Sequence, residues 1–273
     1  MKKFRLLLIL FLLLVLGIGI VFLGKDRRDF RLGVVTDKGV MAVSISFDRR
    51  MVSSLEISGE IPLWIPRGLD WYGADKIKKI LEQEKKKDLA KEVIYYNLGF
   101  WADKVVFLND FSWKKTVLLV KNMGLWPFLE FWYWQDEMFF KQEKIENDLR
   151  QEGLFLDETM LRDFAEGRLL NEEMRITVYN STKDTALASF MATLLTRVGF
   201  SVMGVGGAEP KGEADCYFVY GEGVEGSYGW QVLNSIYKCE VVKDESLADF
   251  EVEIYIGEGY SRMINYSSYV GAF

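Results

Sequence analysis

An uncharged apolar run near the start of the chain constrains its folding more than any other feature. Residues 6–23 are eighteen consecutive leucine, isoleucine, valine, phenylalanine and glycine residues, and Lys2, Lys3 and Arg5 precede them. As a helix, this run is about 27 Å long, close to the thickness of a bilayer core. A cleaved secretory signal is the alternative, but its apolar region is about 7–15 residues long and ends in small residues. The exit sequence, VFLGKD, has no small-residue pair, so we expect an uncleaved transmembrane helix.

The orientation of this helix follows from the charges around it. Only five residues precede the run, whereas Lys25, Arg27, Arg28 and Arg31 follow it and partly offset the initial cations. We expect the start of the chain to stay in the cytoplasm. Residues 1–24 would then be the cytoplasmic start and anchor of a single-pass cell-membrane protein whose C-terminal bulk is extracytoplasmic.

The residue counts exclude several classes of site. The chain has 273 residues, 49% of them hydrophobic, which is enough for one large or two ordinary domains with cores. It contains no histidine, which excludes nucleophile arrangements and zinc sites that depend on imidazole. Two cysteines are too few for a disulfide-dense scaffold or a four-thiolate metal site.

The charge balance bears on possible partners. Downstream of the three initial cations, 31 basic and 40 acidic residues leave a net charge of −9. Such a surface repels phosphate, and Lys and Arg supply most of the non-specific affinity for nucleic acids. We therefore exclude nucleic acid as a partner.

The first part of the exported chain has a mixed α/β pattern. Residues 32–58 alternate as two strands around a turn at residues 48–50, and the first strand has small or apolar residues on both faces. Pro62 and Pro66 predict a loop, and residues 73–97 predict a helix. The charged residues 141–173 predict a closing helix and a connector. We place the domain boundary near residue 171, so that residues 25–171 form a mixed-sheet domain.

An aromatic segment stands out within this domain. Eight of the sixteen positions in residues 125–140 (LWPFLEFWYWQDEMFF) are aromatic. A functional interpretation is a membrane-interface belt or a stacking platform for sugar or lipid, in which Trp126, Trp132, Tyr133 and Trp134 would be the contact residues. The alternative, which we favour, is packing of these rings in the core, because large aromatic side chains are usually buried.

Residues 172–273 predict a small second domain. Strands are expected at residues 175–179, 200–205, 217–220 and 250–256, and helices at residues 187–198 and 227–238. The order is β-α-β-β-α-β, which gives an α+β fold. In that unit the start of the third strand and the end of the second helix lie together, and Cys216 and Cys239 occupy these two places. This placement fits either a disulfide between the two cysteines or two buried free thiols.

A sequon, Asn180-Ser181-Thr182, follows the first strand of this domain. It could accept a glycan, since Asn-x-Ser/Thr is the acceptor pattern for N-glycosylation. We favour a structural interpretation, in which the asparagine ends the strand and the hydroxyls cap the next helix.

The second domain resembles a known family. The string ITVYNST…ALASFMATLLTRVGFSV and the strand EVEIYIGEGY resemble the LytR C-terminal domain, which follows LytR-CpsA-Psr catalytic domains in bacterial envelope proteins. The resemblance covers about residues 174–260. Leu187-Ala188 and Gly199-Phe200 fit its pattern, whereas Thr185 stands where glycine is usual.

The upstream segment MAVSISFDRRMVSSLEISGEIPLWIP is similar to the start of a LytR-CpsA-Psr domain. That family transfers lipid-pyrophosphate-linked glycopolymers to the cell wall, and it uses arginines for the pyrophosphate and carboxylates for a divalent metal. In this chain, Lys38 stands where the metal-binding Asp belongs, and Ser58-Gly59-Glu60 stands where Pro-Arg-Asp belongs. A shifted register could retain part of a site from Asp37, Glu60 and Arg67.

The resemblance therefore implies a degenerate, non-catalytic first domain with no catalytic residue, cofactor or metal. We expect a membrane-anchored envelope protein that binds peptidoglycan or a wall glycopolymer, or acts as a scaffold there. A residual phosphotransferase or pyrophosphatase acting on polyprenyl-pyrophosphate-linked glycans is one alternative. The other is a membrane-tethered adaptor that contacts other envelope proteins through the aromatic segment.

Overall fold

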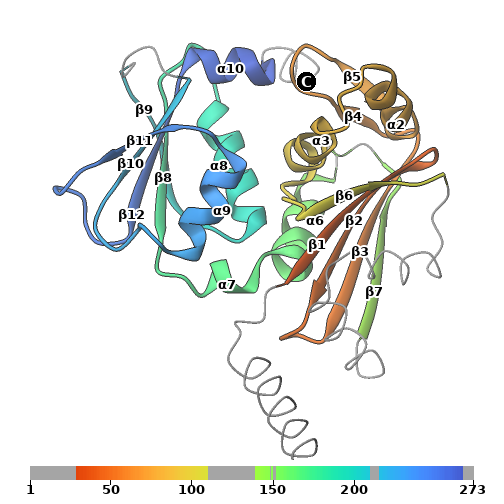
Figure 1. Cartoon of the computed structure of the whole chain (residues 1–273), viewed down its shortest axis with the longest axis horizontal. Coiled ribbons are helices and arrows are strands. Elements are labelled where there is room, and N and C mark those ends of the chain that lie inside the picture. Colours follow the sequence, from red (N-terminus) through yellow and green to blue (C-terminus); the bar gives the residue numbers. More distant parts are fainter. Residues whose placement is uncertain (1–28, 110–138, 148, 150–151, 210–214, 267–273) are drawn as a thin grey trace, which may run out of the picture.

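The computed structural model describes residues 29–109, 139–147, 149, 152–209 and 215–266. Two five-stranded sheets lie on opposite sides of the molecule, and most of the helices lie between them (Figure 1). This arrangement confirms the predicted mixed α+β class. Among the residues described, no helix is both long and apolar enough to cross a membrane. The predicted anchor at residues 6–23 lies outside the described residues.

The first sheet has the strand order β6-β1-β2-β3-β7. Strands β1, β2 and β3 are antiparallel to one another, β6 is parallel to β1, and β7 is parallel to β3. Every residue of β2 is buried, as the predicted strand with two covered faces requires. The bounds are β1 Phe30–Thr36, β2 Gly39–Ser46, β3 Met51–Ser58, β6 Lys104–Phe107 and β7 Phe139–Ile145.

Two helices replace the single helix predicted over residues 73–97. After the short hairpin of β4 (Pro62–Trp64) and β5 (Trp71–Gly73), α2 spans Ala74–Gln83 and α3 spans Leu89–Leu98. Lys85, in the like-charged run between them, has a left-handed φ of 55°. The break allows α2 to pack on the first sheet while α3 also contacts a helix of the second domain.

The closing helix and connector predicted for residues 141–173 are present, but the helix begins later than the start of this range. Residues 141–145 belong to β7, which pairs with β3; Lys144 of β7 is exposed, whereas Lys141 and Glu143 are half-buried. Helical structure begins only with α6, Gly153–Thr159, and continues as a π-helix, η2, over Met160–Phe164. A single turn, α7, spans Gly167–Leu170 before the second domain.

The second sheet has the strand order β11-β10-β12-β8-β9. The predicted β-α-β-β-α-β order is present, with two additions: the edge strand β11 and the final helix α10. All four residues of β11 are exposed, so no buried face marks it in the sequence. The bounds are β8 Arg175–Asn180, α8 Leu187–Val198, β9 Ser201–Gly207, β10 Cys216–Tyr220, α9 Tyr228–Ile236, β11 Glu240–Lys243, β12 Glu251–Ile256 and α10 Glu258–Ile264.

The two halves of the molecule share part of one core. The apolar cluster beneath the second sheet also contains Trp64, Tyr95, Tyr96 and Trp101, which come from β4, α3 and the segment after α3. A separate cluster fills the space between the first sheet and α2 and α3. The shared cluster means that aromatic side chains of the first half are buried against the helices of the second.

Candidate functional site

The turn between β1 and β2 is where the family resemblance would place phosphate- and metal-binding groups. Its carboxylate, Asp37, accepts a hydrogen bond of 3.1 Å from Lys78 Nζ. Lys78 comes from α2, has a largely buried side chain, and also donates to Asn109 Oδ1 at 2.7 Å. The ammonium group therefore already neutralises the carboxylate that a shifted register would offer.

The other residues of the shifted-register hypothesis do not join Asp37. Arg67 forms a two-point ion pair with Glu92 of α3, with nitrogen–oxygen distances of 3.0 and 2.6 Å. The hydrogen bonds that Arg67 donates to Glu92 raise the pKa of Arg67 above its ordinary value. Glu60 is exposed at the end of the β3 segment. Asp37 is thus paired with Lys78 of α2, whereas Arg67 is paired with Glu92 of α3.

Gly59 shows why an arginine does not fit in the segment Ser58-Gly59-Glu60. A Cβ atom at Gly59 would lie 2.7 Å from the carbonyl oxygen of Lys38 and 2.9 Å from Cβ of Asp75. The glycine carbonyl also accepts a hydrogen bond from the Asp75 amide at the start of α2. Any side chain here would have to displace backbone, so the position that resembles the family's arginine is sterically closed.

A divalent cation does not fit this donor set. Such an ion needs several oxygen ligands, and the Asp37 carboxylate already faces the Lys78 ammonium. Within the described residues, no group of three or more Cys, Asp or Glu side chains is arranged to hold a metal ion.

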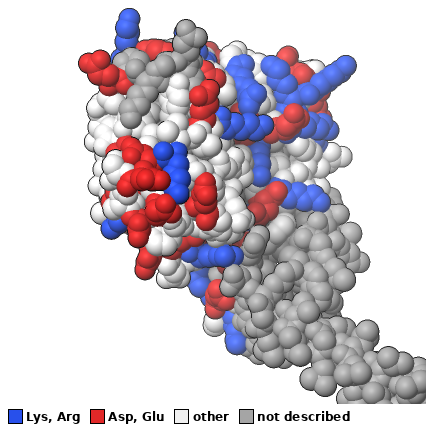
Figure 2. Space-filling view, turned by 60° about the vertical axis from the view of Figure 1, so that its left-hand side comes forward, with Lys and Arg blue, Asp and Glu red and all other residues white. Residues whose placement is uncertain are grey.

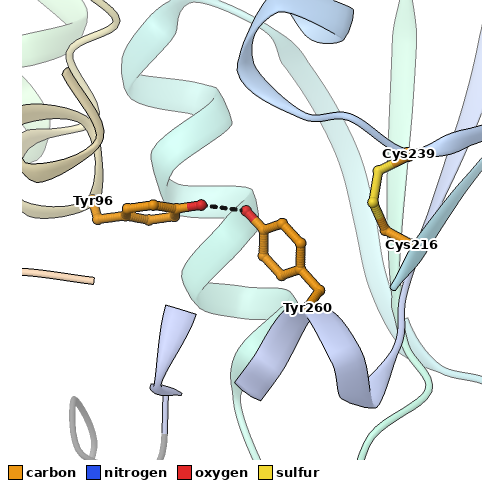
Figure 3. Close-up of a disulfide and its surroundings, with 4 residues drawn as sticks. All are labelled: Tyr96, Cys216, Cys239 and Tyr260. Atoms are coloured by element: carbon orange, nitrogen blue, oxygen red, sulfur yellow. Dashed lines mark hydrogen bonds between the residues drawn. A yellow bond between two sulfur atoms is a disulfide. The ribbon is translucent and has the colours of Figure 1, made fainter. Parts of the chain in front are cut away.

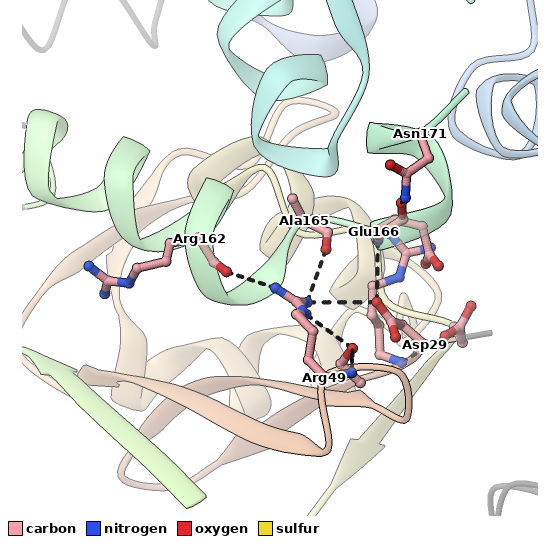
Figure 4. A network of polar contacts seen from close by, with 10 residues as sticks. Asp29, Arg49, Arg162, Ala165, Glu166 and Asn171 are labelled. Atoms are coloured by element: carbon pink, nitrogen blue, oxygen red, sulfur yellow. Dashed lines mark hydrogen bonds and ion pairs between the residues drawn. The ribbon is translucent and has the colours of Figure 1, made fainter. Parts of the chain in front are cut away.

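A second charged cluster lies at the opposite end of β1, where the first sheet meets the connection to the second domain (Figure 4). Arg31 Nη2 lies 3.4 Å from Glu166 Oε2, and both side chains are at most 3% exposed. Arg49, from the β2–β3 turn, lies 3.7 Å from Asp29 and donates to the carbonyl oxygens of Arg162 and Ala165. The guanidinium groups of this cluster bind the protein's own backbone and carboxylates.

Burial dominates the electrostatics of this cluster. It raises the pKa of Glu166 to about 7, and the nearby Arg31 charge only partly opposes the shift. Burial also raises the pKa of Asp29. Among the described residues, Glu166 Oε2 and Arg31 Nε have no hydrogen-bond partner, while a hydrogen bond with Tyr228 lowers the pKa of Glu166 only in part.

Glu166 also connects the cluster to the second domain. Its backbone amide donates to the carbonyl oxygen of Val198 at the end of α8, at 2.9 Å. The charged cluster therefore holds the first sheet, the connecting segment and α8 together.

Pairs of buried tyrosines form a second contact between the halves. The hydroxyls of Tyr96 in α3 and Tyr260 in α10 lie 2.6 Å apart and point toward each other (Figure 3). The hydroxyls of Tyr95 and Tyr237 make a similar contact. Burial raises the pKa of all four phenols, which keeps them neutral and able to donate.

Cys216 and Cys239 form a disulfide in the structure, with a Cα–Cα distance of 4.8 Å (Figure 3). Cys216 opens β10 and Cys239 follows α9, the two places that the fold brings together. Of the two possibilities that the sequence leaves open, the structure contains the bridge.

The sequon at Asn180 has a structural role different from the predicted helix cap. Asn180 Oδ1 accepts from the amide and the hydroxyl of Thr182, and its Nδ2 donates to the carbonyl of Asp184. Helix α8 begins after Ala186 with no side-chain cap. The predicted capping was therefore wrong, because these side chains stabilise the preceding turn.

The other predicted contact residues, Trp126, Trp132, Tyr133 and Trp134, lie outside the described residues. Conversely, the sequence pattern did not single out Glu166 or the tyrosine pairs. The one local signal was Arg31, a charged residue within an otherwise apolar strand.

Comparison with known proteins places residues 173–260 in a family. This segment matches the family model described as LytR cell envelope-related transcriptional attenuator, LytR_C. The molecule is thus an α+β protein whose residues 173–260 match the LytR_C family model, which confirms the resemblance of residues 174–260. No curated protein matches the chain.

Several solved structures are similar to the chain at low identity and low TM-score. One is the LytR-CPS2A-psr family protein YwtF (TagT) with bound octaprenyl pyrophosphate lipid, with 11% identity, a TM-score of 0.26, and coverage of 70% of this chain and 82% of that chain. Another is TagU of B. subtilis, with 7% identity, a TM-score of 0.27, and coverage of 91% and 96%. At these values the likeness assigns no residue role to this chain.

Proposed function

We propose that this protein is a membrane-anchored, extracytoplasmic component of the cell envelope that binds or scaffolds wall material without catalysing its transfer. The LytR_C domain supports the envelope assignment, since the family is described as cell envelope-related. Residues 6–23 are its membrane anchor, and residues 25–171 are a degenerate LytR-CpsA-Psr-like domain. The ligand class is peptidoglycan or a wall glycopolymer.

One observation carries the non-catalytic part of this proposal. Transfer of a pyrophosphate-linked polymer needs cations that neutralise the leaving diphosphate. At the end of the first sheet, the position that resembles the family's arginine is Gly59, where a side chain would collide with the Lys38 carbonyl. The nearby Asp37 and Arg67 are engaged by Lys78 and Glu92.

Co-sedimentation of the detergent-solubilised full chain with purified wall material tests binding. We expect retention in the pellet above that of an unrelated single-pass protein at the same detergent concentration. The double variant Trp132→Ala, Trp134→Ala should reduce retention if the aromatic segment contacts the wall material. It should leave retention unchanged if binding occurs elsewhere in the protein. Retention no greater than that of the control protein would contradict the proposal.

An activity assay tests the alternative enzyme function. The full chain would be incubated with a polyprenyl-diphosphate-linked glycan and Mg²⁺, and phosphate release would be measured. We expect no release above the protein-free rate. Metal-dependent release by the wild type that is lost in Asp37→Asn would show a working site and overturn the non-catalytic assignment.

A further inference from the structure

The four outer strands of the two sheets differ in how their open edges are protected. Strands β6, β7 and β11 all carry charged side chains, which discourage pairing with another strand: Lys104 in β6, Lys141, Glu143 and Lys144 in β7, and Glu240 and Lys243 in β11. Strand β9, with the sequence SVMGVGG, carries none. Among the outer strands of the two five-stranded sheets, β9 is the one without charged side chains, and its pairing with β8 has a register shift between Val202 and Gly204.

The side chains of β9 leave apolar surface exposed beside this edge. Exposed and half-buried residues alternate along its whole length, from Ser201 to Gly207. Met203 is 65% exposed and Val205 is 49% exposed, although both are large apolar residues. The three glycines add no side chain that would shield the backbone. An exposed, uncharged edge of this kind is a template for a further strand.

A groove of about 440 Å³ runs beside the same strand. Val202, Met203 and Val205 form one wall, and Ala192 and Thr196 of α8 contribute to its lining. Leu161 of η2 lies on the first-domain side and is 44% exposed. The volume falls within the range of small binding pockets, about 300–1,000 Å³, so it suits the side chains of a short extended segment.

The charge at the groove favours a cationic occupant. Asp157 and Arg197 neutralise each other through a hydrogen bond of 2.6 Å from Nε to Oδ1. Glu158, which also lines the groove, is exposed and adds a negative charge. Residues 174–273 contain 7 basic and 13 acidic side chains, and Figure 2 shows acidic and basic groups side by side on one face of the molecule.

We propose that β9 and this groove bind an extended segment of a partner protein, which adds to the second sheet as a further strand. Alternate apolar side chains of the segment enter the groove, and a Lys or Arg of the segment pairs with Glu158. A second copy of this chain fits less well, because edge-to-edge pairing would bring two negatively charged domains together. The groove is lined by residues of β9, α8, α6 and η2, and the proposal does not depend on the proposed function.

Binding of a defined peptide tests the proposal. The probe is a blocked seven-residue peptide of alternating valine and threonine with a lysine at each end, titrated into the full chain in detergent and followed by fluorescence anisotropy. We expect saturable binding, and we expect Val205→Lys to weaken it at least about tenfold, since the new charge occupies both the edge and the groove. Val241→Lys on β11 is the matched control, because Val241 is 52% exposed.

The charge of the groove gives a second, independent readout. A peptide with glutamates in place of the lysines should bind the wild type more weakly, and Glu158→Lys should reverse this preference. Equal loss in Val205→Lys and Val241→Lys would overturn the proposal, as would an unchanged preference in Glu158→Lys. Self-association of the wild type that Val205→Lys abolishes would show that the occupant is a second copy, and would also overturn it. Unfolding curves that match the wild type establish that each variant is folded.

Discussion

The Glu166 carboxylate lies 3.4 Å from the Arg31 guanidinium, and both side chains are removed from solvent where the first sheet meets the segment that leads to the second sheet. Removing two charges from water is unfavourable unless their hydrogen bonds are completed. Burial outweighs the attraction of Arg31 and the hydrogen bond with Tyr228, and it raises the pKa of Glu166.

The stability of the protein should therefore depend on pH through Glu166. Its pKa is about 7 in the folded state and near the ordinary 4.5 when unfolded. A raised pKa contributes stability that is fully present below pH 4.5 and is lost as the pH rises through about 7. Relative to Glu166→Gln, the free energy of unfolding of the wild type should fall by up to about 3 kcal/mol across this window. Chemical denaturation at pH 5 and pH 8 measures the difference, with Glu158→Gln as the exposed control. An identical pH slope in wild type and Glu166→Gln would contradict this account.

The Tyr96–Tyr260 hydrogen bond should couple the two domains energetically. Replacing either tyrosine by phenylalanine leaves the other hydroxyl buried without its partner, at a cost of about 1–3 kcal/mol. The double variant should lose less than the sum of the single variants, because no hydroxyl is then stranded. Urea denaturation of all four proteins gives the coupling energy. Strict additivity would show that the contact does not connect the two halves.

The disulfide should stabilise the second domain. The bridge joins residues 23 positions apart, and closing a loop of this size typically contributes about 3 kcal/mol. Cys216→Ser, Cys239→Ser should lower the free energy of unfolding by that order. Thiol labelling of the denatured, non-reduced protein should detect no free sulfhydryl, and two after reduction. Two reactive thiols without reduction would show that the bridge does not form.

Substitution of Gly59 tests whether the segment after β3 can accept an arginine side chain. We expect Gly59→Arg to destabilise the protein by about 1–3 kcal/mol, because Cβ would collide with the Lys38 carbonyl, and we expect it not to confer phosphate release. Gly153→Ala is the control, since nothing lies within 4 Å of a Cβ at that position. A Gly59→Arg variant as stable as the wild type would mean that the segment can open to accept a side chain.

Much of the local structure could be predicted from the sequence. The alternation around residues 48–50 predicts the β2–β3 hairpin, and apolar residues at helical spacing predict α8 between Leu187 and Val198. These patterns are periodic within a few residues, and they remain visible because each element buries one or both faces. The segment that matches the LytR_C family model contains the same kind of periodic pattern.

The elements that sequence patterns missed depend on distant partners. Strand β11 is exposed throughout and β7 is highly charged, so neither has a buried face that a pattern could reveal. Their strand conformation depends on backbone hydrogen bonds to β10 and β3. The break between α2 and α3 likewise follows from the two different surfaces on which these helices pack.

The sequence by itself determined which segments form the main strands and helices, because hydrophobic periodicity is a local property of the chain. Only the tertiary structure decided that Tyr96 meets Tyr260 across 164 residues and that Glu166 is buried against Arg31. Contacts of such separation leave no periodic trace, and their energies arise from burial and desolvation that exist only once the two sheets and their helices have packed together.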